Sequence, residues 1–281
     1  MSTWYCDGNS IDALPIDDRA IHYGDGLFET IAIRAGSPRL WHLHIDRLRY
    51  GCERLAIAMP PEENLHTGLQ QAINESGIDS GYALAKIIIT AGSGRRGYRR
   101  PDSGQGRVLT AVYSAQRLAP AGYRKGVATV RCATALAEQP ALAGIKTLNR
   151  LEQVVARNEW HDPDVHEGLM CDTAGRLICG TMSNVFVVHD QSIITPILDR
   201  CGVAGVMRRH VIDTLHADGI NANEDDIHWD DAMLVDEVFL TNSQYGVLPV
   251  RQCGEQRWAV GPVTRELMKR VAKSGIEECA L

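Results

Sequence analysis

The stretch that decides the fold reads Gly144-Ile145-Lys146-Thr147-Leu148-Asn149-Arg150-Leu151-Glu152. The chain has few lysines, at positions 86, 125, 146, 269 and 273. Lys146 alone follows a run of small residues, 143–145, and opens a segment with apolar residues at helical spacing, namely Leu148, Leu151, Val154 and Val155. A nucleophilic lysine must project from a rigid element into a desolvated pocket, where the pKa of an amine falls. We therefore expect a helix over 147–160 with Lys146 at its start as a candidate nucleophile. The alternative is a solvated lysine in a first helical turn, where a cation opposes the helix dipole.

Length and composition place few limits on the function. The 281 residues are enough for two domains with buried cores. A net charge of −6 argues against nucleic acid or an anionic membrane as a partner. No apolar run approaches the roughly 18 residues that a membrane span needs. The N-terminal residues lack a basic segment followed by an apolar stretch, so we expect no signal peptide and a cytoplasmic location.

The cysteines and histidines give no clear metal or disulfide pattern. Eight cysteines are scattered without a Cys-x-x-Cys pair, which favours reduced thiols over a disulfide framework or a structural zinc site. His42 and His44 alternate as on one face of a strand, but no third ligand lies nearby in the sequence. We therefore predict no metal.

Strand-like and helix-like segments alternate along the chain. Strands are expected at 27–33, 39–41, 82–90, 108–113, 127–131, 167–172, 184–188 and 193–195. Helices are expected at 44–56, 61–74, 147–160, 204–218 and 261–274. The stretch 115–122 contains Pro120 and Gly122 without a strong period, which favours an interdomain linker. The sequence therefore predicts an α/β (or α+β) protein with a smaller N-terminal domain over 1–114 and a larger C-terminal domain over 123–281.

The segment 144–152 resembles the active-site lysine segment of fold-type-IV pyridoxal-phosphate (PLP) enzymes. Its continuation, Leu-Asn-Arg-Leu-Glu, is similar to that of aminodeoxychorismate lyases. Branched-chain and D-amino-acid aminotransferases usually carry a Ser-x-Asn-Tyr-like continuation instead. The resemblance covers roughly residues 4 to 250 and implies a two-domain fold-type-IV structure. It also implies PLP as cofactor and Lys146 as its Schiff-base lysine.

The segment Asp17-Asp18-Arg19-Ala20-Ile21-His22-Tyr23-Gly24-Asp25-Gly26-Leu27-Phe28-Glu29-Thr30 also resembles this family. Its two glycines, Gly24 and Gly26, predict a tight turn before a strand. By itself such a turn is a structural feature. With the lysine segment it becomes a family marker, and the resemblance makes Tyr23 and Phe28 candidate lining for a flat substrate.

Three further segments match places where fold-type-IV enzymes hold the cofactor phosphate. His44-Ile45-Asp46-Arg47-Leu48 puts Arg47 in the first turn of the expected helix, where a surface ion pair is the alternative role. A guanidinium fork suits phosphate oxygens. Gly202-Val203-Ala204-Gly205-Val206-Met207-Arg208 resembles the start of the phosphate-binding helix, where Val206 and Met207 would donate backbone N–H groups. In Thr241-Asn242-Ser243-Gln244-Tyr245-Gly246, Ser243 matches a hydroxyl donor, although a plain cap or turn explains either segment alone.

The loop Arg95-Arg96-Gly97-Tyr98-Arg99-Arg100-Pro101 carries a formal charge of +4. Such a run is usually a solvated surface or a nucleic-acid patch. No aromatic series or second basic patch supports nucleic acid. In an acidic protein the loop instead indicates an anionic small substrate, and aminodeoxychorismate lyases show a similar Gly-Ser-Gly-x-Arg-Gly-Tyr run. We expect Arg96 or Arg100 to bind the substrate carboxylates, and the sequence does not choose between them.

One segment departs from the family pattern. Cys179-Gly180-Thr181-Met182-Ser183-Asn184 resembles a segment that contributes to the cofactor site and whose first residue is usually a glutamate bound to the pyridine nitrogen of PLP. A neutral thiol at position 179 cannot keep that nitrogen protonated as a carboxylate does. Glu167 could substitute, the nitrogen could stay unprotonated because formation of an aromatic product needs a weaker electron sink, or the protein could be a relative without PLP activity. We favour the unprotonated nitrogen, because the other motifs are intact.

The resemblance implies a PLP-dependent lyase that converts 4-amino-4-deoxychorismate to 4-aminobenzoate and pyruvate in folate biosynthesis. It also implies a homodimer, because fold-type-IV enzymes build their sites from two subunits. Two alternatives remain open. One is a branched-chain or D-amino-acid aminotransferase of the same fold, and the other is a binding protein that has lost PLP.

Overall fold

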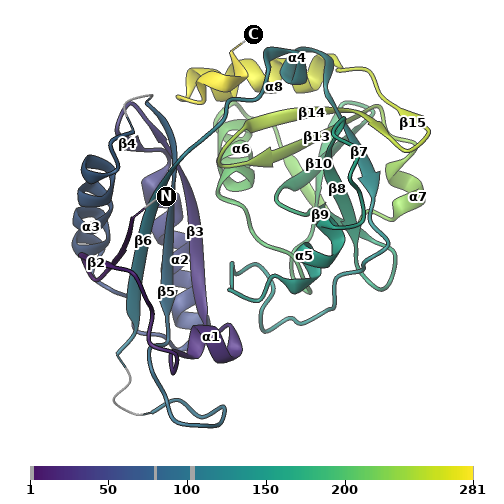
Figure 1. Ribbon diagram of the computed structural model, residues 1–281. Helices are drawn as coiled ribbons and strands as arrows, with labels where there is room; N and C mark the ends of the chain where they lie inside the picture. Colours follow the sequence, from purple (N-terminus) through teal and green to yellow (C-terminus); the bar gives the residue numbers. More distant parts are fainter. Residues whose placement is uncertain (1–2, 79–80, 102–104, 281) are drawn as a thin grey trace. The chain divides into compact units, whose positions relative to one another are not determined.

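The computed structural model describes residues 3–78, 81–101 and 105–280. The chain forms two compact units (Figure 1), the first made of Met1–Arg117 with Ile145–Asn149 and the second of Leu118–Gly144 with Arg150–Leu281. The first crossing falls inside the expected linker 115–122, whose last residues begin the helix α4 (Pro120–Lys125). The return of 145–149 to the first unit is absent from the expected boundaries.

The first unit is an antiparallel sheet with helices. Its strands are β1 (Trp4–Cys6), β2 (Asn9–Ile11), β3 (Gly26–Arg34), β4 (Ser37–Pro38), β5 (Tyr82–Thr90) and β6 (Arg107–Ser114), in the order β2-β1-β6-β5-β3-β4. Its helices are α1 (Arg19–Tyr23), α2 (Trp41–Leu55) and α3 (Glu62–Glu75). The strands β3 and β5 pair along their whole length, from Gly26 opposite Thr90 to Arg34 opposite Tyr82.

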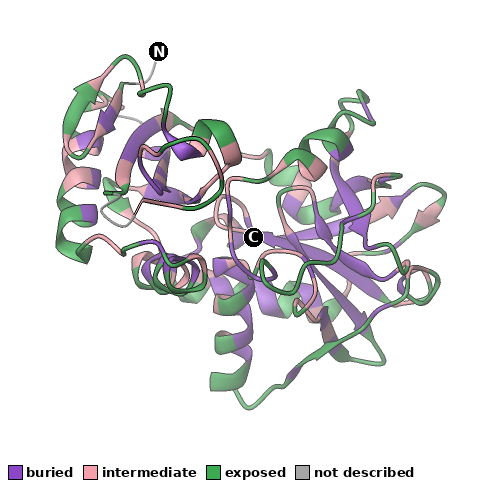
Figure 2. Ribbon diagram, turned by 90° about the horizontal axis from the view of Figure 1, so that it is seen from below, coloured by how far each residue is buried: buried purple, intermediate pink, exposed green. Residues whose placement is uncertain are grey.

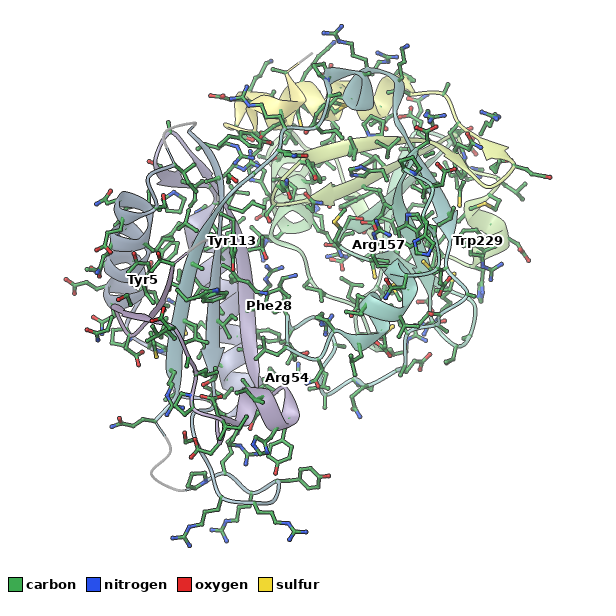
Figure 3. All side chains as sticks on the ribbon, in the orientation of Figure 1. Tyr5, Phe28, Arg54, Tyr113, Arg157 and Trp229 are labelled. Carbon is green, nitrogen blue, oxygen red and sulfur yellow. The ribbon has the colours of Figure 1, made fainter. Side chains whose placement is uncertain are left out.

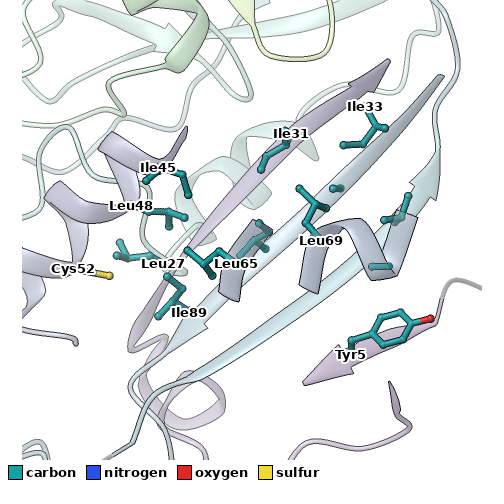
Figure 4. Packing of buried hydrophobic residues seen from close by; sticks show 14 of the residues in the cluster. Tyr5, Leu27, Ile31, Ile33, Ile45, Leu48, Cys52, Leu65, Leu69 and Ile89 are labelled. Atoms are coloured by element: carbon teal, nitrogen blue, oxygen red, sulfur yellow. The ribbon is translucent and has the colours of Figure 1, made fainter. Parts of the chain in front are cut away.

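The core of this unit lies between the sheet and the helices α2 and α3 (Figure 4). Alternate residues of β3 and β5, such as Ile31 and Ile89, point to this side and are fully buried. They meet the apolar stripes of the two helices, represented by Leu48 and Leu69. Ile145 belongs to the same cluster, so the returning segment contributes to this core.

The second unit is built on a larger mixed sheet. Its strands are β7 (Val127–Arg131), β8 (Val165–Cys171), β9 (Leu177–Gly180), β10 (Asn184–His189), β11 (Ser192–Pro196), β12 (Ala222–Asp225), β13 (Glu237–Asn242), β14 (Gly246–Cys253) and β15 (Gln256–Arg257). The order is β12-β11-β10-β13-β14-β7-β8-β9; β15 adds to β14, and β9 also pairs with β10. Helices α5 (Leu151–Arg157), α6 (Val206–Ala217), α7 (Trp229–Ala232), α8 (Pro262–Lys273) and the short helix η1 (Glu277–Cys279) complete it. Figure 2 shows the strands as largely buried. Helices and strands in both units confirm the expected α/β class.

The expected helix over 147–160 is wrong in its first part. Residues 146–148 are not helical and pair with β3, with Thr147 bridged to Leu27. Phe28 donates its backbone N–H to the Lys146 carbonyl at 3.0 Å, and the Leu148 N–H donates to the Gly26 carbonyl at 3.0 Å. These bonds satisfy the backbone groups that a helix would have used, so α5 begins only at Leu151.

The expected apolar stripe of that helix is also wrong. Leu151, Val154 and Val155 are 78%, 52% and 56% exposed, whereas Ala156 is the buried residue of α5. The helix therefore turns its large aliphatic side chains away from the core of its own unit.

The expected strand at 39–41 is wrong as well, because β4 ends at Pro38 and α2 begins at Trp41. His42 and His44 consequently lie on a helix, where His42 is exposed and His44 is fully buried. Arg47 lies in the second turn of α2 and not in the first. Among the residues described, no helix is both long and apolar enough to cross a membrane.

Candidate active site

Lys146 lies on the side of the first unit's sheet opposite the core. In the segment 145–148, Ile145 and Thr147 are buried, and Lys146 between them points the other way, as alternation along an extended chain requires. Its partner across the bridge is Phe28, labelled on β3 in Figure 3, and the Lys146 Nζ lies 4.4 Å from the centre of the Phe28 ring. The structure thus brings together two of the predicted site residues. The backbone of Lys146 is held by a hydrogen bond to β3 and is not part of a helix.

Lys86 is a neighbour that the sequence analysis left in an apolar strand without a role. Its Nζ lies 5.0 Å from the centre of the same Phe28 ring. Residue 86 stands opposite Thr30 in the β3–β5 register, and Phe28 is diagonal to it on the same face. The signal that could have found it is the alternation of β5, which puts Lys86 and Phe28 on one face once the two strands are paired.

On the core side of β3, Glu29 forms a buried cluster with two residues of α2. The Arg47 Nε and Nη2 donate to the Glu29 carboxylate at 2.7 and 2.5 Å, and the His44 Nδ1 lies 2.6 Å from it. Burial alone would raise the pKa of Glu29, but the charges of Arg47 and His44 outweigh it and lower the pKa to about 2. Burial lowers the pKa of His44. The Arg47 side chain is 11% exposed. Its hydrogen bonds to the Glu29 carboxylate fix its orientation. No role was predicted for Glu29, and the ion pair that was the alternative expectation for Arg47 lies in the interior and not at the surface.

The basic loop of the first unit is held to α1 and to the turn that follows it. Arg19 donates to the carbonyls of Gly97 and Tyr98 at 3.1 and 2.8 Å, and its Nε pairs with Asp25 at 2.8 Å. The Gly97 N–H donates to the Tyr23 hydroxyl at 3.2 Å. Tyr23 is thus half-buried against this loop.

The two arginines expected to bind substrate differ in their surroundings. Arg100 forms a two-pronged ion pair with Asp25, at 2.5 and 3.0 Å, and donates to the carbonyls of Leu55 and Ala56. Burial would raise the pKa of Asp25, but Arg100 and Arg19 outweigh it and lower that pKa. Arg96 is exposed near the tip of the loop.

In the second unit, the start of α6 is shaped to receive an anion. The N-cap is Gly205, and no side-chain oxygen in the described part of the chain caps this helix, whose first residues are Val206 and Met207. A Cβ at position 205 would lie 1.9 Å from the Asn184 Oδ1, so any other residue there would displace the Asn184 side chain. Asn184 in turn donates to the Val203 carbonyl at 2.8 Å. Free N–H groups at a helix start, with room for close approach, suit a phosphate.

The loop that carries Ser243 is held as a turn by hydrogen bonds. The Asn242 Oδ1 accepts hydrogen bonds from the N–H groups of Gln244 and Tyr245, at 3.0 and 2.8 Å. The Tyr123 hydroxyl donates to the Tyr245 carbonyl at 3.1 Å. Ser243 is half-buried in this turn.

Cys179 lies in a sulfur-rich apolar cluster with Cys132, Cys201 and Met170. Burial raises the pKa of its thiol, so the side chain is neutral at physiological pH. Position 179 therefore offers no carboxylate charge.

Glu167, the alternative acid for this role, is fully engaged by a neighbouring turn. Its carboxylate accepts five hydrogen bonds, from the N–H groups of residues 168, 181 and 182 and from the hydroxyls of Thr181 and Ser183, at 2.5–3.2 Å. These donors fill the lone-pair directions of the two oxygens. Although those bonds favour the ionised form, burial outweighs them and raises the pKa of Glu167. This geometry argues against Glu167 as a ring-nitrogen partner.

In the first unit, a lysine amine beside an aromatic ring suits an aldehyde with a flat ring. In the second unit, taken by itself, the glycine-lined start of α6 suits a phosphate group.

Comparison with known proteins identifies the family of this chain. The family model for amino-transferase class IV matches residues 26–253. An aminodeoxychorismate lyase from Vibrio harveyi is 34% identical over 259 residues, which cover 90% of this chain and 94% of that protein. The crystal structure of 4-amino-4-deoxychorismate lyase from Pseudomonas aeruginosa superposes with a TM-score of 0.91 at 41% identity, covering 97% of this chain and 99% of the other. A D-alanine aminotransferase from Listeria monocytogenes is 27% identical, covering 90% of this chain and 87% of that protein. The expected fold-type-IV architecture is confirmed, and the chain belongs to the class IV aminotransferase family of PLP-dependent enzymes.

Proposed function

We propose that this protein is a PLP-dependent lyase that converts 4-amino-4-deoxychorismate to 4-aminobenzoate and pyruvate. The observation that carries the proposal is Lys146, held by strand pairing with its amine beside the Phe28 ring. The similarity to lyases at 34% and 41% identity supports this reaction over transamination. The product assigns the enzyme to folate biosynthesis.

Each site residue has a proposed task. Lys146 would bind the cofactor covalently, and Arg47, Ser243 and the N–H groups of Val206 and Met207 would hold its phosphate. When bound, PLP supplies an electron sink for the carbon that bears the substrate's amino group.

The released Lys146 amine acts as the base that removes the proton from C4 of the substrate ring. The carbon–oxygen bond at the neighbouring carbon then breaks, and its electron pair leaves with the enolpyruvyl oxygen. Lys146 returns the proton to the methylene carbon of that fragment, which departs as pyruvate. Tyr23 and Phe28 would line the flat ring.

The arginines at the site are proposed to serve the substrate carboxylates. Arg96 is the more exposed of the two, while Arg100 already pairs with Asp25. We therefore propose Arg96 as the direct contact and Arg100 as the residue that keeps the basic loop in place.

The neutral thiol at position 179 fits a lyase. With Cys179 uncharged and Glu167 occupied by its turn, we propose that the pyridine nitrogen stays unprotonated. The electron sink is then weaker, and formation of an aromatic product compensates for it. A transaminase has no such compensation.

We further propose a homodimer. Leu151, Val154 and Val155 form an exposed aliphatic surface on α5, and such a surface is costly unless a partner covers it. A second copy of the chain is the occupant that the family predicts.

The test is incubation of the PLP-loaded protein with 4-amino-4-deoxychorismate, following 4-aminobenzoate and pyruvate together. Equal amounts of the two products are expected. K146A should lose both the visible absorbance of the bound cofactor and product formation, while K125A, which alters an exposed lysine of α4, should retain both.

The same experiment separates the alternatives. Glutamate formed from 2-oxoglutarate and a D-amino acid, with no cleavage of the substrate ether, would favour a transaminase, as the Listeria relative suggests. Absence of cofactor absorbance in the wild-type protein would favour a binding protein without PLP.

A further inference from the structure

Two loops of the second unit are paired through their backbones, although they are far apart in the sequence. One is the lysine loop (139–144), which leads toward the lysine segment, and the other is the α6 loop (200–204), which leads into α6. The Gly144 N–H donates to the Gly202 carbonyl at 3.1 Å, and the Gly144 carbonyl accepts from the Ala204 N–H at 2.9 Å. At the outer end, the N–H of residue 139 donates to the carbonyl of residue 200 at 2.7 Å. The position of each loop therefore depends on the other.

The α6 loop has little in its own sequence that could fix its conformation. Residues 201–205 read Cys-Gly-Val-Ala-Gly and carry no hydroxyl, amide or charged side chain. Gly202 and its partner Gly144 have φ angles of +87° and +80°, the left-handed region that glycine adopts readily. Glycine also loses more conformational freedom than other residues when it is ordered. The loop must therefore be held in place by groups outside it.

A chain of ion pairs holds both loops at their outer ends. The Arg176 side chain is 5% exposed and pairs with Asp172 at 2.5 Å and with Glu138, next to the lysine loop, at 2.8 Å. It also donates to both oxygens of Asp226, at 3.0 and 3.1 Å. Arg200, the first residue of the α6 loop, donates to the same two oxygens at 2.7 and 2.6 Å. Asp226 therefore connects the α6 loop to an arginine that also holds the start of the lysine loop.

Asp226 can be removed without leaving a buried charge unpaired. Arg176 would retain Glu138 and Asp172, and Arg200 would retain Asp199 at 3.1 Å. The Asp226 side chain itself is 38% exposed, so its loss creates no buried cavity. The specific consequence is that the α6 loop loses its connection to Arg176.

We propose that Asp226 is a positioning residue for the cofactor phosphate, because it holds the α6 loop against the lysine loop and so fixes the N–H groups at the start of α6. The inference rests on the phosphate site at Val206 and Met207 that the proposed function assigns. A helix start binds an anion well when its N–H groups are already aimed at one point. Coupling between two equilibria is reciprocal, so phosphate at α6 also tightens the pairing of the two loops.

Hydrogen–deuterium exchange of the full-length protein freed of PLP tests this coupling, with inorganic phosphate as the probe. Slower exchange at Val206 and Met207 reports that phosphate is bound at α6. Slower exchange at Gly144, whose N–H lies in the loop pairing, reports the coupling. We expect phosphate to slow exchange at all three amides, by at least about threefold at Gly144.

The variant D226A should separate positioning from general stability. It should weaken binding of PLP about three- to tenfold, the size expected for a partly exposed ion pair, and leave binding of pyridoxal, which lacks the phosphate, unchanged. Phosphate should no longer slow exchange at Gly144 in this variant. D218A is the matched control, because Asp218 is 43% exposed and pairs with Arg270 at the other end of α6. It should leave the ratio of PLP to pyridoxal affinity as in the wild type.

Equal weakening of PLP and pyridoxal binding in D226A would overturn the proposal, because the effect would then be a general loss of structure. Phosphate protection at Val206 and Met207 without protection at Gly144 would overturn it too. If D226A lacks a cooperative unfolding transition, R200M takes its place, since it leaves the buried pairs of Arg176 intact. Absence of protection at Val206 and Met207 would refute the phosphate site and this inference together. Absence of pyruvate release would refute only the lyase reaction, because every measurement above is independent of turnover.

Discussion

Replacement of Glu29 by glutamine should expose how much the buried cluster with Arg47 and His44 contributes to stability. The amide keeps the shape of the side chain but removes the charge that the Arg47 guanidinium and the His44 imidazole face. The pKa of Glu29 is lowered from 4.5 to about 2, which corresponds to about 3 kcal/mol of stabilisation of the charged form. Loss of one partner from a buried ion pair independently predicts about 3–5 kcal/mol. We therefore expect E29Q to lower the free energy of unfolding of the first unit by about 3 kcal/mol at neutral pH.

The effect must depend on pH with a defined sign. Because the folded-state pKa of Glu29 is lowered, its stabilisation is fully present above about pH 4.5 and is lost as the pH falls toward about 2. Urea unfolding followed by circular dichroism, at about pH 7, about pH 5 and about pH 3, measures the difference between wild type and variant. The difference should be similar at the two higher values and clearly smaller at the lowest.

Asp46 offers a matched control on the same helix. It pairs with Arg49 at 2.8 Å, but its side chain is 66% exposed, so D46N should change stability by less than about 0.5 kcal/mol. A difference for E29Q below about 1 kcal/mol at neutral pH would refute the reasoning. A large difference that stays constant down to about pH 3 would also refute it, because the cause would then be packing and not charge.

Three further outcomes are expected. G205A should weaken PLP binding at least about tenfold in an equilibrium titration, since its Cβ would lie 1.9 Å from a side-chain oxygen, whereas G68A in open space on α3 should not weaken it. In native protein, mass-spectrometric mapping after alkylation should find Cys6 modified before Cys179, whose pKa is raised by full burial; early labelling of Cys179 would contradict the assigned core. V154E should shift the protein toward monomers in sedimentation analysis, and an unchanged mass would show that α5 is not the dimer surface.

The sequence predicted elements well where local pattern and tertiary environment agree. β5 spans the expected residues 82–90, because its β-branched run is buried in the middle of a sheet. α3, α6 and α8 end within two residues of their expected limits, since each has a clear apolar stripe and a Pro or Gly near one end.

The predictions failed where distant segments meet. The helical spacing after Lys146 is real in the sequence, but backbone pairing of residues 146–148 with β3 overrides it, and the helix begins only at Leu151. No partner could be predicted for the Glu29 carboxylate. Its contacts, His44 and Arg47, lie 15 and 18 residues later in the chain, on a helix whose orientation depends on how it packs against the sheet. Lys86 was overlooked for the same reason, because its neighbour Phe28 lies on another strand.

The return of residues 145–149 to the first unit also determines when this unit can complete its folding during synthesis. When only the first 117 residues have been synthesised, the N-terminal half of β3 is paired with β5 on one side only, its other edge is open, and the core lacks Ile145. An open strand edge of this kind invites association with other chains. The N-terminal unit therefore completes its folding only after about 30 more residues have emerged, and a fragment cut at residue 117 should aggregate. If the first unit is to be expressed separately, residues 145–149 must be kept together with the sheet that they complete.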